Sequence, residues 1–290
     1  MTILVIGSTG TIGSLVVEEL VQRGAGVCAL TKDPGRAKFP AGTTAVKGDL
    51  TDVDSMRAAL VGIDTLFLLN GVVADELTQA LITLNLAMEA GIERFVYFSV
   101  FNSDVFADVP HFTGKHTVER MIERVGLPAT ILRPAYFIQN DAALKDALLG
   151  PGLYPMPIGQ IGVAMVDARD IAEIAALSLM ARENAAEPLP RDMIEIVGPD
   201  LLTGPTLAAI WSEVLNKPIA YGGDDLAALE SQLRTKMPSW AAYDMCVMVR
   251  GFQRDGMVPK QGNLERLTRM LGRPLRTYRG FAQENAPAWR

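Results

Sequence analysis

The sequence predicts an α/β fold built on a doubly wound parallel sheet, followed by a smaller, mainly helical C-terminal lobe. Three observations predict it. Short apolar segments alternate with amphipathic segments through the first two-thirds of the chain. The apolar segments are rich in Val, Ile, Leu and Phe, as strands covered on both faces of a sheet are. The amphipathic segments repeat apolar residues three and four positions apart, which is the spacing of helices.

Six strands and four helices follow from these patterns in order. The strands are predicted over residues 3–6, 27–31, 43–46, 65–69, 95–99 and 129–132. The helices are predicted over residues 12–23, 52–60, 75–90 and 114–125. A glycine follows each helix where a C′ residue belongs: Gly24, Gly62, Gly91 and Gly126. Six alternating strands favour a doubly wound order, in which a ligand binds in the crevice at the carboxyl ends of the strands.

The pattern changes after Arg133-Pro134. Residues 150–162 are rich in Pro and Gly and indicate loop and short edge structure. A strong helix is predicted over 167–180, a strand over 193–197 and a helix over 203–215, after which the chain reads as mostly helical. We therefore predict a first domain of residues 1–150, to which residues 164–198 return. Residues 151–163 and 199–290 form the smaller lobe, which is expected to bind the substrate.

A glycine loop joins the first predicted strand to the first predicted helix. It consists of Gly7, Ser8, Thr9, Gly10, Thr11, Ile12 and Gly13. Gly7 permits a tight turn, Gly10 lets the backbone approach a pyrophosphate, and Gly13 lets the helix pack close to the strand. The helix N-terminus adds unpaired N–H groups and a partial positive charge. An ordinary tight turn is the alternative interpretation, but the strand before the loop and the helix after it favour an NAD(P)-binding Rossmann domain.

The loop spacing is GxxGxxG, which resembles the extended and atypical short-chain dehydrogenase/reductases. Further motifs narrow the resemblance to the NmrA-like group. They are GDLTD at 48–52, GIERFVYFS at 91–99, KHTVE at 115–119, TILRP at 130–134, VDARDIA at 166–172 and LGRP at 271–274. The resemblance covers most of the chain. It is specific for the family and not for an activity within it.

Charge near the second strand favours NADP over NAD. A cation at the end of this strand attracts the 2′-phosphate of NADP, whereas a carboxylate binds the 2′-hydroxyl of NAD. The strand ends in Thr31 and Lys32, with Arg36 close behind, and Lys32 matches the position where NADP-using relatives often carry Arg. Asp33 argues for NAD, although the Pro34 that follows it indicates a turn or cap residue.

The resemblance implies further cofactor contacts in three segments. They are Asp49 and Leu50 beside the adenine, Leu69, Asn70 and Gly71 along the path to the nicotinamide, and Pro134, Tyr136 and Phe137 beside the nicotinamide itself. The residues alone leave two simpler interpretations open. Asp49 is equally consistent with a loop cap, and Asn70-Gly71 with a plain turn at a strand end.

The catalytic residues implied by the resemblance are Lys115, His111 and Ser99. Classical relatives carry a tyrosine four residues before the lysine, and this chain has His111 there. Either His111 donates the proton, or it is a loop residue after Pro110 and solvent supplies the proton. Lys115 is expected to hold the nicotinamide ribose, the alternative being a solvated charge. Ser99 matches the substrate-polarising residue of many relatives.

Two functions remain open at this point. The resemblance implies an NADP-dependent oxidoreductase that transfers hydride from NADPH to a quinone-like or conjugated carbonyl compound. The other is a non-catalytic NAD(P)-sensing regulatory protein of the NmrA type. The missing tyrosine argues against sugar epimerase chemistry, which needs an acid–base residue acting on a hydroxyl. A Met/aromatic set in the C-terminal lobe suits either an apolar, aromatic substrate or ordinary packing: Met237, Trp240, Tyr243, Met245 and Met248.

Composition narrows the partners. A net charge of -6 and a pI near 5.1 give no reason to expect nucleic-acid binding. No run of apolar residues reaches the length of a membrane span, no signal peptide is visible, and the two cysteines have no metal-like spacing. A cytoplasmic monomer or homodimer without a metal site is expected. Residues 250–290 are basic, with nine Lys/Arg against three Asp/Glu, which indicates solvated helix faces or a partner surface.

Overall fold

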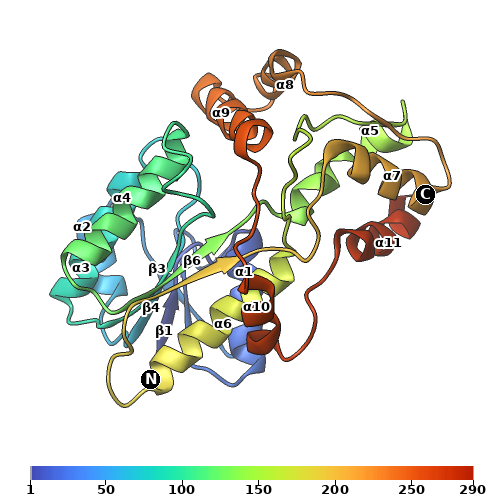
Figure 1. The fold of residues 1–290 in the computed structure, drawn as a ribbon. Helices are drawn as coiled ribbons and strands as arrows, with labels where there is room; N and C mark the ends of the chain where they lie inside the picture. Colours follow the sequence, from blue (N-terminus) through green and yellow to red (C-terminus); the bar gives the residue numbers. More distant parts are fainter. Residues whose placement is uncertain (1, 290) are drawn as a thin grey trace. The chain divides into compact units, whose positions relative to one another are not determined.

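The computed structural model describes residues 2–289, and its main element is a seven-stranded sheet (Figure 1). The strand order is β3-β2-β1-β4-β5-β6-β8. The strands are β1 (Ile3–Val5), β2 (Val27–Thr31), β3 (Thr43–Lys47), β4 (Thr65–Leu68), β5 (Arg94–Phe98), β6 (Ala129–Pro134) and β8 (Asp192–Ile196). Every neighbouring pair from β3 to β6 is parallel. The predicted doubly wound parallel sheet is therefore confirmed.

Helices cover both faces of this sheet. They are α1 (Thr11–Gln22), α2 (Val53–Ala59), α3 (Glu76–Glu89), α4 (Pro110–Arg124) and α6 (Ala168–Asn184). Figure 1 shows α2, α3 and α4 on one side of the sheet, and α1 and α6 pack together on the other. Gly24, Gly62, Gly91 and Gly126 all have positive φ, as C′ glycines do. The sequence placed the ends of most of these helices within one or two residues.

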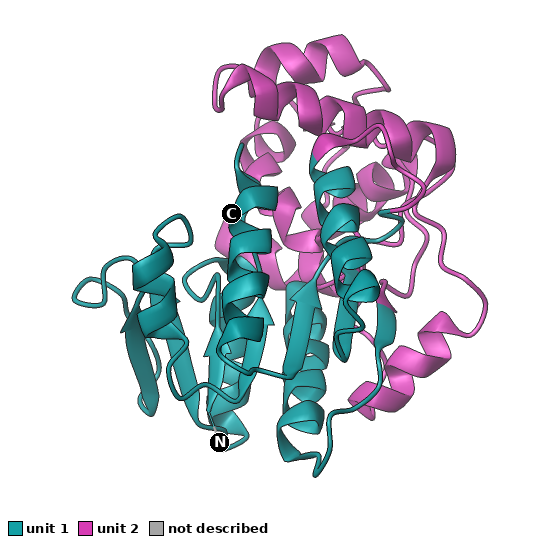
Figure 2. Cartoon of the chain, turned by 90° about the vertical axis from the view of Figure 1, so that its left-hand side faces the viewer, with its two compact units in different colours: residues 1–103, 111–133, 168–194 teal, residues 104–110, 134–167, 195–290 magenta. Residues whose placement is uncertain are grey.

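The chain divides into two compact units (Figure 2). Unit 1 contains the chain up to residue 103 together with 111–133 and 168–194. Unit 2 contains 104–110, 134–167 and the chain from residue 195 onward. The division expected from the sequence differs in that it assigned residues 104–110, 134–150, 164–167 and 195–198 to the first domain. None of the helices within residues 2–289 is long and apolar enough to cross a membrane.

One apolar core of unit 1 lies between the sheet and helices α2, α3 and α4. Side chains from five strands meet apolar residues of these helices there. Leu4 of β1, Leu66 of β4 and Ile122 of α4 are at most 1% exposed. Burial of such side chains contributes roughly 1.5–3 kcal/mol each, which explains why the strands read as continuous apolar runs.

Unit 2 is mainly helical, as predicted. Its elements are a 3₁₀ helix η1 (Ile138–Leu144), α5 (Lys145–Leu149), β7 (Leu153–Tyr154), α7 (Gly204–Leu215), β9 (Ala220–Tyr221), α8 (Leu226–Leu233), α9 (Ser239–Asp255), α10 (Asn263–Leu271) and α11 (Tyr278–Trp289). Strands β7 and β9 pair in parallel. Helices α7 and α11 pack through Trp211 and Trp289, whose rings stack with centroids 4.8 Å apart. Thr203 caps α7, because its hydroxyl accepts the N–H of Thr206.

A buried carboxyl group lies in the core of unit 2. Asp141 Oδ2 accepts hydrogen bonds from the hydroxyls of Tyr154, at 2.8 Å, and Tyr278, at 2.5 Å. The Tyr278 oxygen in turn accepts from Trp211 Nε1 at 2.8 Å. Asp141 Oδ1 has no hydrogen-bond partner among the described residues. Burial raises the pKa of Asp141 to about 6, since neither tyrosine supplies a charge that would compensate for lost solvation.

The Asp141→Asn variant tests this environment through the pH dependence of stability. Because the folded-state pKa lies above the unfolded value, the protonated carboxyl favours folding and this advantage is lost as pH rises through about 6. The stability of the variant minus that of the wild type should therefore rise by about 2 kcal/mol between pH 4.5 and pH 7.5. Urea unfolding at both pH values measures it. Asp146→Asn, at an exposed carboxyl in α5, is the control, and a pH-independent difference for Asp141→Asn would contradict the interpretation.

Candidate functional site

The glycine loop folds back so tightly that two of its positions exclude a side chain. Gly7 has a φ of +74°, and a Cβ there would lie 2.6 Å from Leu69 Cδ2. A Cβ on Gly13 would lie 2.1 Å from the Gly7 carbonyl oxygen. A Cβ on Gly10 meets only that same oxygen, at 3.4 Å. Gly7 and Gly13 are therefore required by the fold, whereas the fold tolerates a side chain at position 10.

The glycine loop leads directly into the N-terminus of α1. Gly10 is its N-cap residue, and no side chain caps this end of the helix. The first-turn N–H groups of a helix have no partner within the helix, and together with the helix dipole they attract an anion. Ser8 takes a different part, because its buried hydroxyl donates to the Leu30 carbonyl at 2.7 Å and ties the loop to β2. Only the backbone of Ser8 is thus available to a ligand.

A cavity of about 820 Å³ lies next to the loop within unit 1. It is lined by Ile6, Gly7, Ser8, Thr9, Ser14, Leu30, Thr31, Lys32, Asp33, Arg36, Ala37, Lys38, Gly48 and Leu50. The sequence predicted Thr31, Lys32, Arg36 and Leu50 as contacts here and did not select Lys38. Three cationic side chains against one carboxylate give the wall after β2 a net positive charge. A cavity of this size is in the range of cofactor sites.

Lys32 forms an ion pair with Asp49, with Nζ 2.9 Å from Oδ2. The hydrogen bond from Lys32, followed by those from the backbone and side chain of Thr51, lowers the pKa of Asp49 to about 2. Asp49 thus caps its own loop, as one of the two sequence interpretations expected. Its ionised carboxylate also holds Lys32 at the cavity.

Asn70 follows β4 with a buried side chain whose amide nitrogen and oxygen both lack partners among the described residues. The side chain belongs to a residue that is 5% exposed. Buried polar atoms in folded proteins are almost always hydrogen-bonded, so an unpaired amide indicates a partner that is supplied from outside the chain. Leu69 packs on Gly7, which places the segment before Asn70 against the glycine loop.

Lys115 is buried rather than solvated. It is 6% exposed, and its Nζ donates to Glu76 Oε1 at 2.5 Å. Glu76 begins α3 and is itself buried. Sequence reasoning missed Glu76, because the two residues lie 39 positions apart and no local pattern links them.

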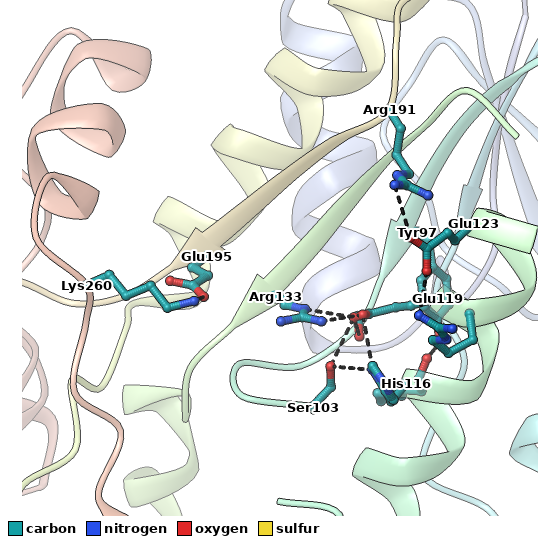
Figure 3. A network of polar contacts seen from close by, with 12 residues as sticks. Tyr97, Ser103, His116, Glu119, Glu123, Arg133, Arg191, Glu195 and Lys260 are labelled. Carbon is teal, nitrogen blue, oxygen red and sulfur yellow. Dashed lines mark hydrogen bonds and ion pairs between the residues drawn. The ribbon is translucent and has the colours of Figure 1, made fainter. Parts of the chain in front are cut away.

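Ser99 belongs to a buried network around Glu119, part of which Figure 3 shows. Glu119 accepts from Arg133 through Nε at 2.9 Å and Nη2 at 2.5 Å, and from Ser103 at 3.2 Å. The Ser99 hydroxyl donates to the same carboxylate. Its proton therefore points to Glu119 and is not offered to a ligand.

Two further titratable side chains are candidate proton donors: Tyr97, which contacts the Lys115 backbone, and His111, which lies on the same helix as Lys115. Tyr97 of β5 is buried, and its hydroxyl lies 3.5 Å from the Lys115 carbonyl oxygen. Desolvation, and then the nearby carboxylates of Glu76 and Glu119, raise the pKa of Tyr97 far above its usual range. This phenol is thus a poor replacement for the family tyrosine. His111 lies one helical turn before Lys115 with its ring edge-on to Phe112, at 4.7 Å between centroids.

The structure corrects one expectation about His111. Helix α4 begins at Pro110, so His111 belongs to its first turn and not to a loop. Proline is well suited to the start of a helix, where its fixed φ is helical and its missing N–H needs no partner.

The residues expected beside the nicotinamide and the Met/aromatic set lie in unit 2. Tyr136 packs edge-on against Phe252, with ring centroids 5.6 Å apart, and Phe137 forms a β-bridge with Val166. The Met/aromatic set divides, since Met248 of α9 is buried while Trp240 and Tyr243 are 42% and 51% exposed.

The basic C-terminal stretch forms ion pairs within unit 2. Arg254 lies 3.1 Å from Asp108, Lys260 lies 3.0 Å from Glu195, and Arg279 lies 2.5 Å from Glu213. At least three of its nine cations are thus paired locally.

Comparison with known proteins agrees with this geometry. Residues 1–271 match the NmrA-like family. The chain belongs to the NmrA-like family. An NAD(P)H azoreductase of Xenophilus azovorans is 30% identical over 294 residues, which cover 99% of each chain. The family resemblance inferred from the motifs is confirmed.

Solved structures show the same fold. An NADPH-dependent quinone oxidoreductase of Escherichia coli in complex with NADPH superposes with a TM-score of 0.86 at 23% identity, covering 98% of this chain and 99% of that one. NmrA, a negative transcriptional regulator, superposes with a TM-score of 0.79 at 18% identity, covering 99% and 96%. The NmrA-like fold thus includes both an enzyme and a regulator.

Two glycine substitutions should separate folding from ligand binding in this NmrA-like chain. Gly13→Ala places a Cβ 2.1 Å from the Gly7 carbonyl oxygen, which is a severe overlap. It should lower the free energy of unfolding by about 2 kcal/mol or more. Gly10→Ala fits the fold and should cost no more than about 1 kcal/mol, but its methyl group faces the expected pyrophosphate and should weaken dinucleotide binding at least tenfold. Urea unfolding and calorimetric titration measure the two effects. Undiminished binding by Gly10→Ala would contradict the assignment of the loop.

Proposed function

We propose that this protein is an NADPH-dependent oxidoreductase that transfers hydride to a quinone-like or conjugated carbonyl small molecule. The observation that carries the proposal is the cavity beside the glycine loop, with Lys32, Arg36 and Lys38 on the wall where an adenosine 2′-phosphate would lie. The names of similar proteins support the acceptor class: an azoreductase, a quinone oxidoreductase and a triphenylmethane reductase are named for conjugated compounds.

The residues present fit a dinucleotide. The uncapped N-terminus of α1 suits the pyrophosphate, and the cations after β2 suit the 2′-phosphate. Leu50 lines the adenosine end of the cavity. The unpaired amide of Asn70 offers both a hydrogen-bond donor and an acceptor to a ligand at the carboxyl end of β4. When bound, NADPH would supply the hydride.

Few side chains of unit 1 are placed to supply the accompanying proton. Ser99 donates to Glu119, and the strongly raised pKa of Tyr97 makes its phenol a weak proton donor. His111 is the remaining candidate at the start of α4. A quinone or polarised alkene delocalises the charge that hydride transfer creates, so protonation by solvent is sufficient. We therefore assign the protein's contribution to binding and orientation rather than to acid–base catalysis.

A specific observation also favours the second function, dinucleotide sensing without turnover. The resemblance assigns Ser99 and Lys115 to catalysis, and both side chains are buried. Each donates a hydrogen bond to a carboxylate of the protein, Ser99 to Glu119 and Lys115 to Glu76. A site arranged in this way binds a dinucleotide without needing a reaction. The fold of the regulator NmrA is compatible with this alternative.

Cofactor preference should depend on Lys32. Lys32→Glu places a negative charge where the 2′-phosphate is proposed to bind, and should weaken NADPH binding at least tenfold while changing NADH binding by less than about threefold. Fluorescence titration with both cofactors measures this. Lys47→Glu is the charge-matched control, because Lys47 is exposed and does not line the cavity. A wild type that binds NAD(H) tenfold more tightly than NADP(H) would refute the assignment.

Turnover distinguishes the two functions. We expect NADPH oxidation, followed at 340 nm, with members of a panel of quinones and enones. The His111→Ala variant should retain kcat within about threefold if solvent supplies the proton, whereas loss of a general acid lowers kcat by about a hundredfold or more. Tight NADPH binding without turnover of any acceptor would identify a sensor. A hundredfold lower kcat in His111→Ala would instead assign proton donation to the imidazole.

A further inference from the structure

The ion pair between Glu76 and Lys115 is the feature of unit 1 that the proposed function leaves unexplained. Both residues are buried, at 8% and 6% exposure, and their charged atoms are 2.5 Å apart. Removing two charges from water is costly, and apolar residues of similar size often stabilise a fold as well or better. Packing alone therefore gives no reason for a carboxylate and an ammonium at these positions.

The ammonium has capacity for a second partner. A lysine carries three N–H donors. Among residues 2–289, the Lys115 ammonium donates one hydrogen bond, to Glu76. Its other two N–H groups can therefore donate to a ligand. The Glu76 side chain is buried in the first turn of α3, and burial restricts its rotamers. Its carboxylate therefore also fixes the direction of the other two Lys115 N–H groups.

Asn70 gives an independent indication that a ligand belongs in this region. It precedes Glu76 by six residues in the segment that joins β4 to α3, and its buried amide is unpaired at both atoms. The ribose hydroxyls and the ring carboxamide of a nicotinamide nucleoside offer the complementary donors and acceptors. The two observations concern different side chains, and Asn70 and Glu76 lie near the two ends of the segment that follows the carboxyl end of β4.

We propose that Glu76 is a positioning residue that holds the Lys115 ammonium toward the hydroxyl groups of the nicotinamide ribose. The inference rests on the proposed function, since it requires a bound nicotinamide dinucleotide. Glu76 acts through Lys115, whose remaining N–H groups donate to the ribose oxygens. Without the carboxylate, a buried ammonium is left without an opposite charge and does not keep its place.

The test compares a whole cofactor with one half of it. NADPH contains the nicotinamide ribose, whereas adenosine 2′,5′-bisphosphate contains only the adenosine half that binds at Lys32. Glu76→Gln keeps the size of the side chain and removes its charge. It should weaken NADPH binding by about tenfold, as expected for a hydrogen bond to a charged group. It should leave the affinity for adenosine 2′,5′-bisphosphate within about twofold of the wild type.

Two further variants establish that Glu76 acts through Lys115. Lys115→Gln should show the same selective loss, and the Glu76→Gln, Lys115→Gln double variant should bind NADPH no more weakly than Lys115→Gln alone. The double variant carries no unpaired charge, so it keeps the test valid if Glu76→Gln does not fold. Asp75→Asn is the matched control, because Asp75 is the exposed carboxylate directly before Glu76 and its side chain accepts a hydrogen bond from Gln79. It should leave both affinities unchanged.

The outcomes are distinct. Equal weakening of both ligands by Glu76→Gln would show a purely structural ion pair and overturn the inference, as would unchanged binding of both ligands. In either case NADPH binding by the wild type would leave the proposed function standing. A wild type that binds neither ligand would overturn the proposed function, and the inference with it.

Discussion

The close approach of α1 to the turn after β1 is the constraint on which the site depends. A single methyl group at Gly13 would overlap the Gly7 carbonyl, so the helix N-terminus lies directly beside the end of the central strand. Strands β2 and β4 flank β1 in the sheet. The segments that follow them carry Lys32 and Asn70, and thus lie on either side of the loop. The sheet reverses its order of connection at this point, which is where doubly wound folds bind their ligands.

Buried charges in unit 1 are organised as pairs and networks that join separate elements. Glu119 connects α4 to Ser99 after β5 and to Arg133 of β6. Arg182 of α6 donates to the carbonyls of Pro128, Leu189 and Pro190 and to the Thr130 hydroxyl. Its desolvation lowers the pKa of Arg182 to about 10, which leaves the side chain charged at neutral pH. These groups are costly to bury alone, so each fixes the position of the element that carries its partner.

The sequence was most informative where the signal is local. Strand β2 was predicted with its observed bounds, because its apolar run ends where a charged segment begins. In the sheet this strand pairs with β1 on one side and with β3 on the other. The start of α4 was placed four residues late, because Gly114 and the polar residues before it resemble a loop, while Phe112 is in fact buried within the first turns. Strands β7 and β9 are two residues long and leave no periodic pattern. Lys32 and Arg36 were selected from their position at and just after the end of the second predicted strand. Glu76 and Asp141 were not, because each meets its partners only after the chain has folded.

The side chains that are engaged by carboxylates also limit the chemistry that the site can perform. An enzyme that reduces an isolated carbonyl benefits from a donor close to the developing alkoxide, since the charge stays on one oxygen. The hydroxyls of Ser99 and Tyr97 are each directed at an acceptor on α4, Ser99 at the Glu119 carboxylate and Tyr97 at the Lys115 carbonyl oxygen. A conjugated acceptor spreads the same charge over several atoms, and its protonation need not coincide with hydride transfer. The burial of these hydroxyls and the histidine at position 111 therefore favour the same class of acceptor, for one physical reason. In the proposed function, the protein therefore binds and orients the reactants, and the acceptor itself accommodates the charge.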